Sequence, residues 1–150
     1  MAAVKVVAHT ILPAPPDDAW RRLLAWEEQA RWMKDADSVR VLTSSREGVG
    51  VRVAVRTRVL NVPMFTEQLE VTVWDPPRRL VMAHRSFVRG VGEWRLEADG
   101  DGTRFTWTED LSLPVPLLGE VALALYRPFM RRLMRGALDG LSGLIGGRPA

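Results

Sequence analysis

The C-terminal part of this 150-residue chain is a long amphipathic run, and it limits the folds open to the rest. The run extends from Pro116 to about Leu144, and its apolar residues recur every three or four positions, the period of one helix face. At about 1.5 Å per residue the helix would be roughly 40 Å long. Such a helix needs a wide surface to lie on. The apolar stripe consists of Leu117, Val121, Leu125, Phe129, Leu133, Ala137, Leu141 and Leu144.

Strand-like segments fill most of the chain before this run. The cleanest alternation lies in residues 49–60, where valines alternate with arginines and the valine side should face the core. Asp99-Gly-Asp-Gly102 is a strong hairpin signal between two such segments. We therefore predict a seven-stranded antiparallel sheet. Its strands are Val4–Leu12, Ser38–Ser45, Val49–Leu60, Met64–Trp74, Arg79–Val88, Gly92–Ala98 and Thr103–Leu113.

Two short helical segments separate the first two predicted strands. Prolines 13, 15 and 16 and the acidic pair Asp17-Asp18 mark the start of the first helix, which carries Trp20. A second helical piece covers about 27–33, and residues 35–37 should form a loop. The order β-α-α-β6-α has no repeat and no linker, so we expect one α+β domain over residues 1–150.

Composition excludes several classes of protein. Hydrophobic residues make up 47% and charged residues 26% of the chain, as in soluble globular proteins. The chain has no cysteine, which excludes disulfides and thiol nucleophiles. Its net charge of +3 is spread along the sequence, so we expect no nucleic-acid partner. We also expect no transmembrane segment and a cytoplasmic location, because no stretch suits a membrane helix or a signal peptide. We expect no metal site, because the two histidines lie far apart in the sequence and no cysteine is present, and we expect no cofactor.

Three passages resemble the helix-grip (SRPBCC) superfamily, which includes birch-pollen-allergen proteins, steroidogenic-lipid-transfer (START) domains and a polyketide cyclase/dehydrase group. They are Ile11 to Trp20 with Trp32 after it, Val73 to Leu80, and Pro116 to Leu133. The resemblance covers nearly the whole chain and implies a sheet wrapped around the C-terminal helix, with an internal cavity between them. It specifies architecture and leaves the chemistry open, because this fold serves both carriers and enzymes.

Polar residues at inward strand positions are the candidates for chemistry in the cavity that the resemblance implies. Glu67 shares parity with apolar neighbours, and so does Glu109; either could move a proton if it lines the cavity. His84 suits proton transfer near neutral pH. Glu67 could instead reach water at a strand end, and the opposite register, with Val81 and Ala83 inward, would expose His84. His9 should face solvent.

The predicted ligand-binding residues combine polar positions with aromatic, methionine and leucine side chains that could form a soft lining. Ordinary core packing explains most of the apolar ones equally well. The set comprises Thr57, Met64, Phe65, Gln68, Met82, Ser86, Trp94, Trp107, Leu125, Tyr126, Phe129, Met130 and Leu133.

Three functions are compatible with these observations. The first is a pocket that binds a hydrophobic or aromatic small molecule, such as a polyketide, lipid or isoprenoid. The second is a polyketide cyclase or aromatase in which Glu67, His84 or Glu109 moves protons. The third is a protein-interaction module that uses the helical arginine stripe Arg127, Arg131 and Arg135. An acyl carrier protein would fit this arginine face, although a solvated helix face explains it as well.

Overall fold

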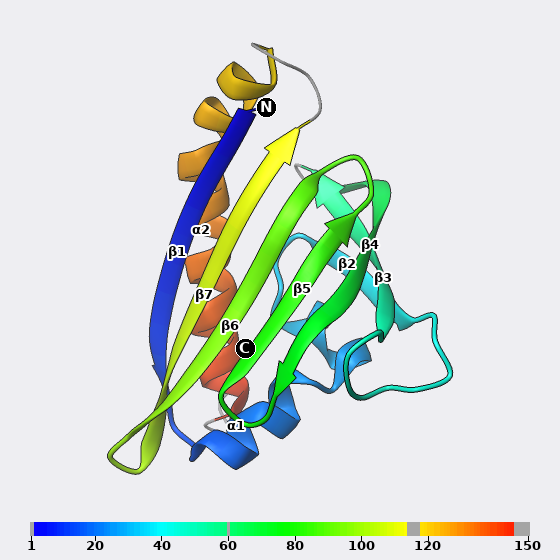
Figure 1. Ribbon diagram of the computed structural model, residues 1–150. Helices are drawn as coiled ribbons and strands as arrows, with labels where there is room; N and C mark the ends of the chain where they lie inside the picture. The colour runs from blue at the N-terminus through cyan, green and yellow to red at the C-terminus, as the bar shows by residue number, and fades with distance from the viewer. Residues whose placement is uncertain (1, 60, 114–117, 146–150) are drawn as a thin grey trace.

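The computed structural model of the chain describes residues 2–59, 61–113 and 118–145. A seven-stranded antiparallel sheet curls around the long helix α2 (Leu118–Ile145), which confirms the predicted helix-grip architecture (Figure 1). The strands lie in the order β1-β7-β6-β5-β4-β3-β2, so β1 pairs with the last strand and the others pair with their neighbours in sequence. The strands are β1 (Ala2–Leu12), β2 (Ala36–Val41), β3 (Arg52–Val59), β4 (Val62–Asp75), β5 (Arg79–Arg85), β6 (Arg89–Asp99) and β7 (Gly102–Leu113).

Two short helices lie at one end of the sheet, and helix α2 begins near the other end (Figure 1). Helix α1 (Pro16–Leu23) has proline at its start and two aspartates in its first turn, where their charge favours the helix dipole. The 3-10 helix η1 (Trp26–Arg31) follows it. Trp20 of α1 packs edge-on against Trp74 of β4, with ring centroids 5.3 Å apart. This contact holds α1 against the sheet.

The loop between β2 and β3 is longer than the sequence predicted. Strand β2 ends at Val41 rather than Ser45. The Thr43 hydroxyl donates to the Ser45 carbonyl at 2.9 Å, and such local bonds compete with a strand ladder. Strand β3 starts at Arg52 rather than Val49, because Gly48 and Gly50 adopt positive φ values of 94° and 96°. Inside β3, Val53, Val55 and Thr57 are buried as predicted, but Ala54 on the opposite face is buried as well, at 7% exposure.

Helix α2 buries only part of its predicted apolar stripe. Ala137 and Leu141 are buried in the core, as expected, and Leu144 packs against it. Val121 and Leu125 are 59% and 75% exposed, so the prediction that they face the sheet is wrong. Periodicity identifies one face of a helix, but the reach of the sheet decides how much of that face is covered. Leu117 and Pro116 lie outside the described residues. No helix in the described part of the chain is long and apolar enough to cross a membrane.

Candidate functional site

A cavity of about 160 Å³ lies between the sheet and α2. Its lining comes from β3, β4, β5, β6, β7, α2 and the segment before β2, and it is mostly apolar. The lining includes two tryptophans, Trp94 and Trp107. Their rings pack edge to face, with ring centroids 6.3 Å apart. Five lining residues carry ionisable groups that can take part in acid–base chemistry: Asp35, Glu67, His84, Glu109 and Tyr126.

His84 on β5 reaches Glu109 on β7 across the intervening strand β6. Its Nε2 lies 3.0 Å from Oε2 of Glu109. Position 92, which pairs with Glu109 in the β6–β7 ladder, is a glycine. A Cβ at Gly92 would lie 2.9 Å from both carboxylate oxygens of Glu109. The missing side chain therefore makes room for the contact, which explains a glycine inside a strand.

Glu67 on β4 approaches His84 from the other side. Its Oε1 lies 3.6 Å from Nδ1 of His84, an ion-pair distance beyond that of a hydrogen bond. Thr57 on β3 donates a long hydrogen bond of 3.5 Å to Oε2 of Glu67. The imidazole therefore lies between two carboxylates, and β4, β5 and β7 supply these three side chains.

The two carboxylates keep His84 protonated. Burial alone would lower the pKa of His84, since the charged ring is removed from water. The hydrogen bond and the negative charge of Glu109, together with the negative charge of Glu67, outweigh burial and raise the pKa to about 10. His84 is therefore a cation at neutral pH, and both ring nitrogens carry protons.

Asp35 is a cavity carboxyl group in the segment 35–37, which was predicted only as a loop. It precedes β2, and its backbone carbonyl accepts a hydrogen bond from the Arg58 amide at 2.6 Å. Burial raises its pKa to about 6, and the negative charges of Glu67 and Glu109 add to this effect. Tyr126 of α2 also lines the cavity, and burial, with the charges of Asp35 and Glu67, raises its pKa to about 12. The aspartate lies in a polar segment without periodicity, so only the fold could place it.

The structure brings the three candidate catalytic residues together at the cavity wall. It also places eight of the predicted ligand-binding residues in the lining. Phe65 is 43% exposed and Tyr126 is partly exposed, which puts both where the cavity meets solvent. The eight residues are Thr57, Phe65, Met82, Trp94, Trp107, Tyr126, Met130 and Leu133.

Five predicted ligand-binding residues are not in the lining. Met64 and Gln68 have the opposite parity to Glu67 on β4 and are exposed. Ser86 follows the end of β5, where its hydroxyl accepts a hydrogen bond from the Gln68 amide at 2.8 Å. Leu125 faces solvent on α2. Phe129 packs against the ring of Tyr126 at 5.3 Å instead.

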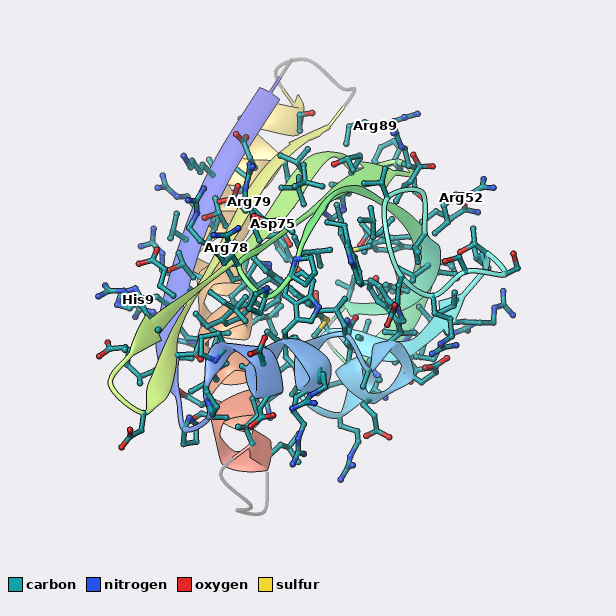
Figure 2. All side chains as sticks on the ribbon, turned by 60° about the horizontal axis from the view of Figure 1, so that its bottom comes forward. His9, Arg52, Asp75, Arg78, Arg79 and Arg89 are labelled. Carbon is teal, nitrogen blue, oxygen red and sulfur yellow. The ribbon has the colours of Figure 1, made fainter. Side chains whose placement is uncertain are left out.

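The remaining charged candidates lie on the outside. His9 is exposed on β1, and its side chain points away from the molecule, as do those of Arg52 and Arg89 (Figure 2). Arg127 and Arg135 are exposed on α2, and Arg131 is partly exposed. The described residues include no group of three His, Cys, Asp or Glu side chains placed to hold a metal ion.

Comparison with known proteins agrees with this fold. A sequence model of the family described as "Polyketide cyclase / dehydrase and lipid transport" matches residues 3–145. The chain belongs to this family. No curated protein sequence matches it.

Solved structures of the same fold come from several sources. A protein from Thermus thermophilus shares 23% identity at a TM-score of 0.79, over 96% of this chain and 98% of its own. The Zhui aromatase/cyclase of a Streptomyces species shares 19% identity at a TM-score of 0.76, over 96% and 94%. A START superfamily protein from Mycobacterium smegmatis shares 11% identity at a TM-score of 0.70, over 95% and 97%. Identities this low establish the fold alone.

Proposed function

We propose that this family member binds a small hydrophobic or aromatic molecule in the cavity between the sheet and α2. The observation that carries the proposal is a mostly apolar cavity with a few converging polar groups, which is the usual composition of a ligand site. Membership of a family described by cyclisation and lipid transport supports it.

The volume of the cavity limits the size of the ligand that it can hold. Its volume of about 160 Å³ is small beside the roughly 300–1,000 Å³ of common ligand pockets. An apolar cavity of about 150 Å³ holds one benzene ring. A one-ring aromatic or a short branched chain therefore fits the cavity as it stands. A long polyketide or isoprenoid would need side chains such as Met130 and Leu133 to move.

Binding of toluene and benzene measured by calorimetry, together with native mass spectrometry of the purified protein, tests the proposal. Leu133→Trp would fill the cavity from α2 and should abolish binding. Leu125→Trp adds the same side chain to the exposed face of the same helix and should leave binding unchanged. If neither hydrocarbon binds the wild-type protein and no co-purified ligand appears, the proposal is wrong.

A second candidate function is proton-transfer catalysis of the cyclase or aromatase kind. It is favoured by the placement of His84 between Glu67 and Glu109 inside the cavity wall. Glu67 would accept a proton from the carbon next to a ligand carbonyl, and the His84 cation would stabilise the enolate oxygen that forms. The test is deuterium incorporation into the methyl group of acetophenone in D₂O, followed by NMR. Glu67→Gln should reduce exchange to the background rate; an unchanged rate would exclude this role for Glu67.

An acidic carrier protein is the proposed partner for the arginine face of α2. Arg127 and Arg135 are exposed, and the neighbouring Tyr126 lines the cavity, so a partner docked there would be close to the ligand. Charge reversal at Arg127 and Arg131 should weaken binding of an acyl carrier protein in a pull-down or calorimetric titration. Reversal at Arg52, which lies on β3, is the control. Equal binding by all variants would exclude docking on this face.

A further inference from the structure

One nitrogen of His84 has no hydrogen-bond partner. This atom is Nδ1, and among the described residues no other buried side-chain nitrogen or oxygen lacks a hydrogen-bond partner. The His84 side chain is only 9% exposed. The other ring nitrogen, Nε2, is already bonded to Glu109. A buried donor without an acceptor is costly, so such an atom calls for an explanation.

The surroundings of Nδ1 define what could satisfy it. The closest carboxylate oxygen, Oε1 of Glu67, is 3.6 Å away. An oxygen placed beside the line that joins these two atoms can lie about 2.8 Å from both, a normal hydrogen-bond length. Such an oxygen would have to accept from Nδ1–H and donate to Oε1. A hydroxyl group can do both at once, a carbonyl oxygen can only accept, and a methyl group can do neither.

We propose that His84 Nδ1 and Glu67 Oε1 form a subsite for one hydroxyl group of the ligand, so that the ligand is a small phenol or another compact molecule that presents an enolic or phenolic O–H. This inference rests on the proposed ligand-binding function and specifies its ligand class. Thr57 supports the subsite, because its hydroxyl lies 3.5 Å from Oε2 and orients the Glu67 carboxylate. The apolar walls around Trp94 and Trp107 would receive the ring.

Selectivity between ligands of equal shape follows from this arrangement. Phenol and toluene differ in a hydroxyl and a methyl group on the same ring. Toluene leaves water more readily, but it leaves Nδ1 and Oε1 unpaired when it occupies the subsite. A site built to bond a hydroxyl discriminates strongly against an analogue that lacks it. We expect phenol to bind at least about tenfold more tightly than toluene.

Calorimetric titration of the wild-type protein with phenol and with toluene tests the inference. Glu67→Leu removes the acceptor Oε1 and leaves only the bond from Nδ1–H, so it should reduce the preference for phenol, while toluene still binds. Glu70→Leu is the matched control: Glu70 lies on the same strand, bonded to Arg85 at 3.3 Å, and should keep the preference.

A measurement on the unmutated protein covers the case in which Glu67→Leu fails to fold. The ¹⁵N resonance of His84 Nδ1 should shift when phenol is added and stay in place when toluene is added. If both ligands bind equally and neither moves this resonance, the hydroxyl subsite is refuted and the proposed ligand-binding function stands. If neither ligand binds, the ligand-binding proposal itself is refuted and the subsite falls with it.

Discussion

The indole nitrogen Nε1 of Trp107 donates a hydrogen bond of 2.8 Å to Oε1 of Glu109. The other oxygen of this carboxylate contacts Nε2 of His84. Glu109 is therefore held by two donors, buried at 8% exposure, and has no oxygen turned free toward the cavity. This arrangement makes Glu109 a residue that positions His84, whereas Glu67 has the more loosely held carboxylate.

Removing the indole donor should destabilise the protein. Trp107→Phe leaves Oε1 of Glu109 buried without its partner, and we expect the free energy of unfolding to fall by about 1–3 kcal/mol more than for Trp94→Phe. Trp94 is the matched control, because it is equally buried in the same aromatic cluster and its indole bonds no carboxylate among the described residues. Urea denaturation measures both values. Equal losses would show that packing alone explains the effect.

Filling the gap at Gly92 should separate His84 from Glu109. Gly92→Ala places a Cβ 2.9 Å from both oxygens of Glu109, so the carboxylate must move. We expect a lower pKa for His84, followed by NMR titration of its imidazole ring. Gly136→Ala on α2 is the control, since its Cβ would meet Lys34 Cγ at an ordinary 3.6 Å. That change should leave the pKa unaltered and stabilise the helix by up to about 1 kcal/mol. An unchanged His84 pKa in Gly92→Ala would contradict the idea that the glycine makes room for the His84–Glu109 contact across β6.

The stability of the protein should decrease at alkaline pH because of His84. The folded state raises the pKa of this group from 6.5 to about 10, so between these values the folded protein binds more protons than the unfolded chain. The stabilisation that protonated His84 gives the folded state is complete below pH 6.5 and is lost as the pH rises through about 10. Denaturation of wild type and His84→Gln across this range should show a difference that shrinks with pH. A constant difference would refute the assignment.

The two halves of α2 should respond differently to truncation. Leu138→Ala removes a side chain that is 1% exposed and should cost about 2–5 kcal/mol. Leu125→Ala removes one that is 75% exposed and should change stability by less than about 0.5 kcal/mol. Thermal or urea denaturation of the two variants measures both losses of stability. Comparable losses would mean that the apolar stripe is covered along its whole length.

Strand periodicity predicted much of the site. The alternation in β3 identified Thr57 as the polar residue on the buried side, and the same parity argument placed Glu67 and Glu109 on the cavity side. These assignments need only the period of two, because each strand has one face toward the core. The strand and helix patterns predicted the elements and their order, and the resemblance to the helix-grip superfamily implied that the sheet wraps around the C-terminal helix.

Other parts of the site depend on contacts between strands, which periodicity does not contain. In β5, Val81 and Ala83 are 8% and 9% exposed, about as buried as Met82 at 8%, so hydrophobicity could not indicate which face of the strand carries His84. Pairing with β4 and β6 decides it. The meeting of His84 with Glu109 further requires Gly92 in the strand between them, and a glycine in a strand was the available sequence signal.

Helix α2 is one continuous helix, but its two halves contribute unequally to the stability of the fold. Pro128 lies within it and supplies no amide hydrogen for the carbonyl of Ala124. Before this proline, Val121 and Leu125 bury little surface; after it, Met134, Ala137 and Leu138 are anchored in the core. Segments with few buried contacts open at a small fraction of the global unfolding free energy. Because Tyr126 of the weakly anchored half lines the cavity, we expect local opening of this half to be the route by which the proposed ligand enters and leaves, while the anchored half keeps the fold intact.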